Sequence, residues 1–101
     1  MTTVTARSGW FVLYPDGCAW LAVRIADGGA VRDVVEQANA ETHLAANDPL
    51  AAVCRAIGDG DTDVQMTCEQ AVAVIEAVNA WAGSSWQPEN VTVEELLLDA
   101  A

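Results

Sequence analysis

The stretch from Gly9 to Gly29, GWFVLYPDGCAWLAVRIADGG, decides the fold that the sequence predicts. It contains two runs rich in β-branched, aromatic and other apolar residues, separated by Pro15, Asp16 and Gly17. Proline at the first turn position, aspartate at the next and glycine in the left-handed place are typical of a type I turn with a bulge. We therefore predict an antiparallel β-hairpin over about residues 10–26.

The predicted hairpin has two apolar faces. Its register would pair Tyr14 with Cys18, Val12 with Trp20, and Trp10 with Ala22. The first face then carries Trp10, Val12, Tyr14, Cys18 and Trp20, and the second carries Phe11, Leu13, Ala19, Leu21, Val23 and Ile25. An isolated hairpin is marginal in water, so helices must cover at least one face.

Four helices are predicted after the hairpin. The first runs from about residue 30 to 46, and the second follows Asp48 as N-cap and ends at Gly58. The third begins at a capping box of Thr67 and Gln70 and ends at Gly83. Its apolar stripe is Ala71, Val74, Ile75, Val78 and Trp81.

A second capping box, Thr92 with Glu95, predicts the fourth helix, with Glu94 and Glu95 in its first turn. The predicted fold class is thus α+β: an N-terminal antiparallel β-hairpin packed by three to four α-helices. The chain of 101 residues suits one small acidic domain.

Composition indicates a soluble, cytoplasmic protein. No apolar run approaches the ~18 residues of a membrane span, and residues 1–10 lack the layout of a signal peptide. The three cysteines are odd in number and widely spaced, which disfavours a disulfide scaffold.

Charge is the unusual feature of this chain. Fifteen acids face four bases, all arginine, for a net charge of −11. Residues 56–101 hold nine acids and no base. Such a body repels nucleic acid and anionic membranes and attracts basic surfaces. Solubility alone is the competing explanation for the acidity.

The segment GDGDTDVQMTCEQ, residues 58–70, resembles the start of a helix–loop–helix calcium site. Counted from Asp59, the first, third and fifth positions are aspartates, as that site requires. The sixth position is Val64 instead of glycine, and the twelfth is Gln70 instead of a bidentate glutamate. We therefore expect an acidic loop and no calcium site, with a degenerate calcium module as the lesser alternative.

No other motif indicates catalysis or a cofactor. His43 is the only histidine, and no cysteine has the setting of a nucleophile. A zinc site from Cys18, His43, Cys54 and Cys68 lacks supporting spacing. Phosphate-binding glycine patterns are missing. We expect a non-enzymatic protein without metal or cofactor.

The function expected is that of an inhibitor. A small acidic protein can occupy a basic groove meant for nucleic acid, as phage anti-defence proteins of the anti-CRISPR or DNA-mimic type and toxin immunity proteins do. The predicted partner-binding residues are Asp59, Asp61, Asp63, Glu69, Glu76, Trp86, Glu89, Glu94 and Glu95.

Trp86 has two interpretations. It lies in the polar loop GSSWQPEN, so it could anchor an interface or fold back over the core. The alternative function is an assembly or chaperone-like adaptor that binds through the aromatic hairpin face. A homodimer through Trp10, Tyr14 and Trp20 on that face is a related alternative.

Overall fold

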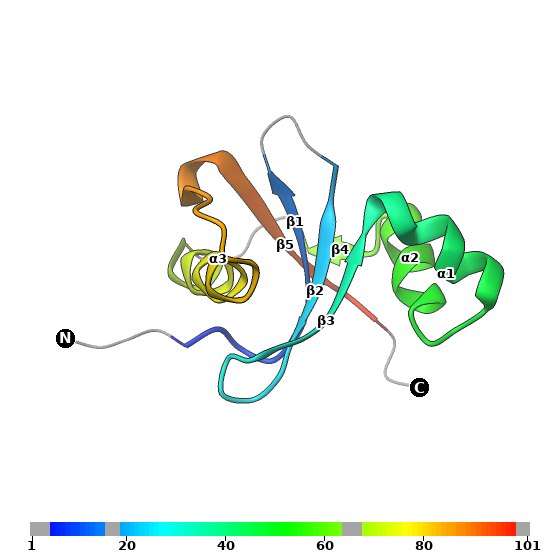
Figure 1. The fold of residues 1–101 in the computed structure, drawn as a ribbon, viewed down its shortest axis with the longest axis horizontal. Coiled ribbons are helices and arrows are strands. Elements are labelled where there is room, and N and C mark those ends of the chain that lie inside the picture. The colour runs from blue at the N-terminus through cyan, green and yellow to red at the C-terminus, as the bar shows by residue number, and fades with distance from the viewer. Residues whose placement is uncertain (1–4, 16–18, 64–67, 99–101) are drawn as a thin grey trace.

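The computed structural model describes residues 5–15, 19–63 and 68–98, except for the side chain of Cys68. A five-stranded antiparallel sheet with strand order β3-β2-β1-β5-β4 forms its middle layer (Figure 1). The strands are β1 (Gly9–Pro15), β2 (Leu21–Ile25), β3 (Val31–Glu36), β4 (Thr62–Asp63) and β5 (Val91–Leu96). The helices are α1 (Ala40–Ala46), α2 (Ala51–Gly58) and α3 (Cys68–Ala82), with short 3-10 turns η1 (Gln37–Asn39) and η2 (Pro88–Asn90).

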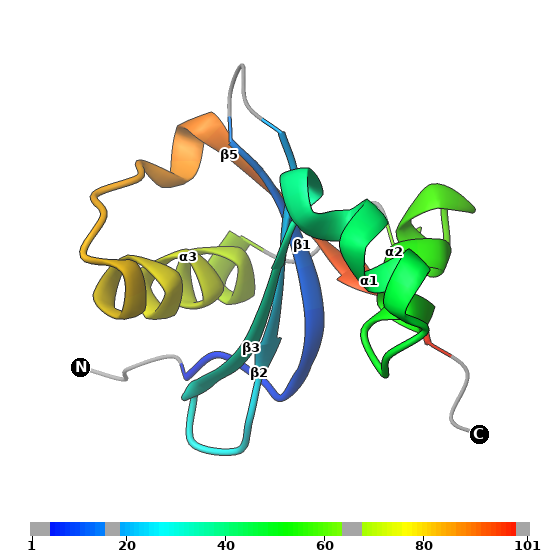
Figure 2. The same ribbon diagram turned by 45° about the vertical axis from the view of Figure 1, so that its right-hand side comes forward.

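The three layers confirm the predicted α+β class. α3 covers one face of the sheet, and α1 and α2 cover the other (Figures 1 and 2). None of the helices in the described part of the chain is long and apolar enough to cross a membrane.

The N-terminal hairpin is present, with a register that differs by two residues. Val12 pairs with Ala22 and Trp10 with Arg24. Because side chains alternate with a period of two, this shift leaves each of them on its predicted face. The last pair of this ladder is Leu13 with Leu21, so the connection between the two strands is longer than the three-residue loop that was predicted. The turn residues Asp16, Gly17 and Cys18 lie outside the described residues.

Each face of the sheet buries its own core. Between the sheet and α3, the most deeply buried side chains are Phe11, Leu13, Val23, Ile25, Val74, Ile75 and Val78. Between the sheet and α2, they are Val12, Ala22, Val35, Val53, Cys54 and Leu96. The prediction that helices cover at least one of the two apolar hairpin faces is therefore confirmed, and the structure covers both.

The helix predicted over residues 30–46 is wrong in its first half. Residues 31–36 form strand β3, and only residues 40–46 form α1. Gly28 and Gly29 adopt positive φ, and the Ala26 amide donates to the Ala30 carbonyl at 2.8 Å. The DGG segment thus closes a second hairpin instead of ending the first. Val34 and Val35 then pack on opposite faces of the sheet.

The helix predicted from Thr92 is also wrong, because residues 91–96 form the strand β5. Val91 and Val93 alternate toward α3, while Leu96 packs toward α2. Sheet pairing with β1 overrides the local capping signal, because without β5 the apolar strand β1 would have a neighbour on one side only.

The other two helices follow the prediction closely. α2 ends at Gly58, and α3 is followed by Gly83 with φ 69°. The start of α2 differs from the prediction of Asp48 as N-cap, because the helix begins at Ala51 with Leu50 as its N-cap residue and no side-chain capping hydrogen bond. Asp48 Oδ1 accepts the Leu50 amide at 3.0 Å in the turn before the helix. The capping box at the start of α3 involves Thr67, which lies outside the described residues.

Candidate partner-binding surface

The loop between α2 and β4 presents three of the predicted binding residues. Asp59, Asp61 and Asp63 are all exposed to solvent. Backbone hydrogen bonds hold the loop in place: the Asp61 amide donates to the Ala56 carbonyl at 2.9 Å. The Leu97 amide donates to the Asp61 carbonyl at 2.8 Å, which ties the loop to the chain after β5. The carboxylates therefore project from an ordered backbone.

Asp63 continues this acidic surface into the sheet. It lies directly opposite Glu95 in the β4–β5 ladder. Like charges in opposite positions destabilise a ladder, and here Arg7 relieves the repulsion by forming an ion pair with Glu95. We call Asp59, Asp61, Asp63 and Glu95 the acidic edge.

Glu94 and Glu95 lie on opposite faces of the sheet, not together in a helical turn. Glu95 is on the α3 face, beside Phe11, and Glu94 is on the face covered by α1 and α2, beside Val12. Glu94 also faces Tyr14, whose hydroxyl has a pKa raised by burial and, to a lesser degree, by the charge of Glu94. A single partner bound at the edge of the sheet can therefore contact both glutamates only at the periphery of its binding surface.

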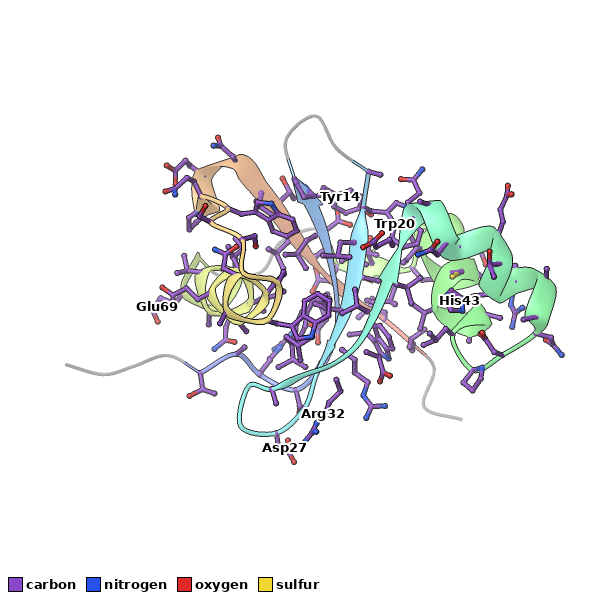
Figure 3. All side chains as sticks on the ribbon, viewed as in Figure 1. Tyr14, Trp20, Asp27, Arg32, His43 and Glu69 are labelled. Atoms are coloured by element: carbon purple, nitrogen blue, oxygen red, sulfur yellow. The ribbon has the colours of Figure 1, made fainter. Side chains whose placement is uncertain are left out.

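The remaining acids lie on α3 and η2 and not on the α2–β4 loop, β4 or β5. Glu69 and Glu76 are exposed on α3, and Glu89 is exposed in η2. Figure 3 shows Glu69 on the α3 side of the molecule and His43 on the α1 side, with the sheet between them. The predicted set of acids therefore divides between an edge cluster and a scattered group.

Trp86 folds back onto the core. Its side chain is half-buried against the core between the sheet and α3. The Asn79 side chain holds the loop around it: Oδ1 accepts the Trp86 amide at 3.0 Å and the Ser84 hydroxyl at 2.8 Å. Nδ2 of Asn79 donates to the Trp86 carbonyl at 3.0 Å. We call this arrangement the Asn79 clamp.

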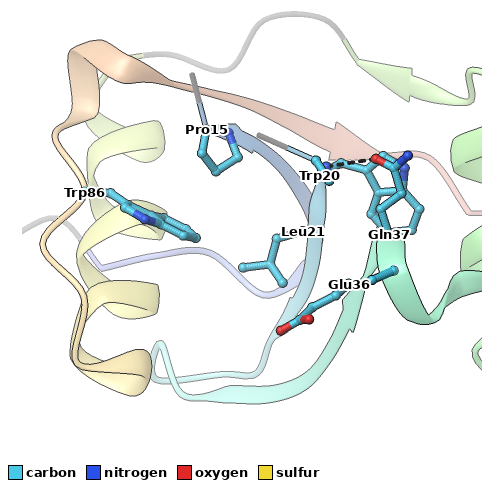
Figure 4. Close-up of a pocket in the computed structure, with 8 residues that line it drawn as sticks. Pro15, Trp20, Leu21, Glu36, Gln37 and Trp86 are labelled. Atoms are coloured by element: carbon cyan, nitrogen blue, oxygen red, sulfur yellow. Dashed lines mark hydrogen bonds between the residues drawn. The ribbon is translucent and has the colours of Figure 1, made fainter. Parts of the chain in front are cut away.

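The indole of Trp86 also lines a hollow of about 280 Å³ (Figure 4). Pro15 and Leu21 lie across from it, and Glu36 and Gln37 are on the β3 side. The lining is mostly apolar, and Trp86 presents only part of its surface to solvent. The tryptophan that is largely exposed is Trp81, at 54%, although the helical stripe predicted it to be buried. It lies in the last turn of α3, beyond the well-packed part of the helix.

The aromatic hairpin face is partly covered. Trp10, Tyr14 and Trp20 are half-buried and pack against the core between the sheet and α2. Binding of a partner or of a second copy at this face stays a prediction, and it would use only the parts of these rings that remain accessible.

His43 is bound to Asp48 at the turn between α1 and α2. Its Nδ1 lies 2.8 Å from Asp48 Oδ2, and this hydrogen bond is the main reason that the pKa of Asp48 is lowered. Cys54 is buried nearby, and burial raises the pKa of its thiol, with a further contribution from the charge of Asp48. A raised thiol pKa is the opposite of what a nucleophile requires.

No group of three or more potential metal ligands is found among residues 5–15, 19–63 and 68–98. Gln70, the twelfth position of the calcium-like loop, uses its Oε1 to accept the Arg7 amide at 3.2 Å. Val64, the sixth position, lies outside the described residues. The absence of a calcium site stays a prediction.

Comparison with known protein families, with curated proteins and with solved structures found no match to this chain. Its function is therefore inferred from the geometry and charge of the molecule itself. Two of its features escaped the sequence reasoning: the Asn79 clamp and the ion pair of Arg7 with Glu95. The ion pair joins two residues that are far apart in the sequence and meet only in the folded sheet. The clamp joins Asn79 to Ser84 and Trp86, which follow it closely, but the segment around them has no recognised turn motif.

Proposed function

We propose that this chain is a non-enzymatic inhibitor that binds a basic, nucleic-acid-binding surface of a partner protein through its acidic edge. The partner's own ligand would be nucleic acid, and the chain would compete with it. Inhibitors of the anti-defence type and toxin immunity proteins belong to this functional class.

The observation that carries the proposal is the accessibility of the negative charge. Asp59, Asp61 and Asp63 are exposed, and none of them forms an ion pair with any residue that the structure describes. Two of the four arginines are already paired, Arg7 with Glu95 and Arg24 with Asp33. The excess charge of the chain is thus available to a partner instead of being neutralised internally.

The ordered backbone of the acidic edge supports a specific contact. A flexible acidic tail would lose conformational entropy on binding. Here, hydrogen bonds to Ala56 and Leu97 already fix the loop that carries the carboxylates. Arginine side chains that bind phosphate can bind carboxylate with the same two-pronged geometry, so a nucleic-acid-binding groove is a fitting partner.

The experiment begins with capture of the partner by the tagged protein from a lysate of the organism that encodes it. The partner is then tested for nucleic-acid binding with and without the chain. The proposal expects a partner with a basic groove whose nucleic-acid binding falls as the chain is added. A partner that lacks a basic surface, or that binds the chain and nucleic acid together, would contradict it.

A charge-matched pair of variants then tests the acidic edge. Asp59→Asn with Asp61→Asn removes two charges from it, and Asp63 is kept because it belongs to the Glu95 and Arg7 arrangement. Asp27→Asn with Glu41→Gln removes two exposed charges elsewhere. We expect the first double variant to slow association by roughly three- to tenfold at low salt, with a smaller effect at high salt. The control should stay close to the parent, because its charges lie outside the contact.

Equal effects of the two double variants would mean that only net charge matters. If neither variant has an effect and salt does not weaken binding, the adaptor alternative is favoured. Changes at Trp10 or Trp20 that abolish binding without unfolding the chain would then identify the hairpin face as the contact.

A further inference from the structure

The hollow beside Trp86 lies where the α3 side of the sheet meets the loop before η2. Trp86 packs against the core between the sheet and α3, and Leu21 packs against the same core from β2. In Figure 4, the Trp86 indole and the Leu21 side chain point toward one another across the hollow, and Pro15 lies above them. The main surfaces of the hollow are therefore an aromatic ring and apolar side chains.

Glu36 brings a carboxylate to this apolar surface. It lies directly opposite Leu21 in the β2–β3 ladder, and side chains in opposite positions share one face of a sheet. The Glu36 carboxylate is accordingly on the same side of β2 as Trp86 (Figure 4). It is exposed and forms no ion pair with any residue that the structure describes. No arginine is among the described residues that line the hollow.

Hydrogen bonds fix two walls of the hollow before any ligand binds. On one side, the Asn79 clamp holds the Trp86 backbone by both its amide and its carbonyl. On the other side, the Gln37 amide donates to the Trp20 carbonyl at 3.1 Å, and Gln37 Oε1 accepts the Trp20 amide at 3.3 Å. An ordered site loses less conformational entropy on binding than a flexible one. The hollow is therefore suited to bind a ligand in the shape that the structure shows.

The charge of the hollow decides which ligand fits it. An anion would be repelled by Glu36 and by the net charge of −11. A neutral apolar molecule would remove water from the Glu36 carboxylate without replacing its hydrogen bonds, which is unfavourable. An ammonium group pairs with this carboxylate, and an apolar body attached to it packs on Leu21, Pro15 and the indole. The face of the Trp86 indole also attracts a cation.

The size of the hollow favours a small molecule over a protein side chain. An apolar cavity of about 150 Å³ accommodates benzene, and the hollow is about 280 Å³. It therefore has room for an aromatic ring with a short chain that carries an amine. A lysine side chain is unbranched and narrow, so it would leave much of the Trp86 and Leu21 surface without contacts.

From these observations we propose that the hollow is a binding site for a small organic amine whose apolar part packs between Trp86 and Leu21 and whose ammonium group pairs with Glu36. The inference is independent of the proposed function, because β2 and β3 lie toward one end of the strand order and β4, with the acidic edge, lies at the other. The two surfaces are thus available to different ligands.

Nuclear magnetic resonance titration of the isotope-labelled protein tests the proposal, with phenethylamine as the probe. The resonances of the Trp86 indole N–H and of the Leu21 and Gln37 amides should shift with a dissociation constant on the order of 1 mM. Phenethyl alcohol has nearly the same size without the charge and should bind about fivefold or more weakly. Phenylacetate is an anion and should cause no shifts at these positions.

Two pairs of matched variants identify the groups responsible. Glu36→Gln should weaken phenethylamine binding by about five- to tenfold and leave phenethyl alcohol binding unchanged. Glu41→Gln removes the same charge from an exposed α1 residue and should leave the binding of both probes unchanged. Trp86→Phe should weaken the binding of both probes, whereas Trp81→Phe, in the exposed last turn of α3, should weaken neither. Because Glu36 is exposed, its variant tests the site even where Trp86→Phe destabilises the fold.

The results that would contradict an amine site are distinct from one another. Phenethylamine at roughly tenfold above the expected dissociation constant could leave the resonances around the hollow unshifted. The amine and the alcohol could bind equally well, which would mean that Glu36 does not select the ligand. Glu36→Gln and Glu41→Gln could weaken binding equally, which would indicate a general effect of net charge. Acetyl-lysine methylamide could bind more tightly than phenethylamine, which would assign the hollow to a side chain of a protein partner. Any one of these results overturns the proposal.

Discussion

Replacing Asn79 with alanine tests the packing of α3 against the segment that leads to β5. The Asn79 side chain makes three hydrogen bonds to Ser84 and Trp86, of 2.8 to 3.0 Å. At a net ~1 kcal/mol for each bond, the loss is about 3 kcal/mol. Alanine recovers roughly 0.6 kcal/mol through its better helix propensity. We therefore expect Asn79→Ala to lower the free energy of unfolding by about 2 kcal/mol.

Urea unfolding followed by circular dichroism measures this loss, and thermal melting should show a decrease on the order of 10 °C. Ser84→Ala removes one of the three hydrogen bonds and is the matched control, with an expected loss of about 1 kcal/mol. Asn79→Asp keeps an acceptor for the Trp86 amide and loses the Nδ2 donor, so its loss should lie between the two. If Asn79→Ala costs no more than Ser84→Ala, the side chain does not hold the loop and the reasoning is wrong.

Two further predictions concern pH and calcium. The pKa of Asp48 is lowered in the folded protein, mainly by the hydrogen bond from His43. The stability that this hydrogen bond contributes is therefore present above the ordinary aspartate pKa and is lost as pH falls through the lowered folded value. Asp48→Asn keeps an acceptor for the Leu50 amide and should flatten this dependence in denaturation curves recorded at several acidic pH values. Millimolar calcium should change neither the melting temperature nor the tryptophan fluorescence, because Val64 and Gln70 replace the glycine and glutamate of a calcium loop. A stabilisation of the folded protein by more than about 1 kcal/mol would instead show that the loop binds calcium.

The sequence predicted the hairpin, its two apolar faces, α2 and α3, because these depend on local patterns. Alternating apolar residues determine a strand face, and i, i+3, i+4 spacing determines a helix stripe. It failed at residues 31–36 and 91–96, where local signals agreed with either structure. Thr92 and Glu95 have the spacing of a capping box, yet Val91 and Val93 also alternate as strand residues do. Only the need of β1 for a second neighbour decides between them.

The candidate site could be predicted in part. Exposure of Asp59, Asp61 and Asp63 follows from their density in a polar loop. The opposition of Asp63 and Glu95 could not be foreseen, since it requires the β4–β5 ladder. Trp81 is exposed although its place in the helical stripe predicted burial, and Trp86 takes the second of its two interpretations by folding back over the core. The exposure of Trp81 depends on how far α3 extends past the sheet, and the position of Trp86 depends on how Asn79 holds the following loop. The helical periodicity of the sequence gives no information on either.

The place of β5 beside β1 governs when the sheet can assemble. β1 pairs with a strand about eighty residues later in the chain, and β4 joins the sheet only through β5. A nascent chain can form the β1–β2 and β2–β3 hairpins early, but it cannot complete the ladder until residue 96 has been synthesised. Long-range pairing of this kind slows folding, because closure of a large loop must precede the contacts that reward it. During that interval, the unpaired side of β1, with Phe11, Val12 and Leu13, is the segment of this chain most exposed to aggregation.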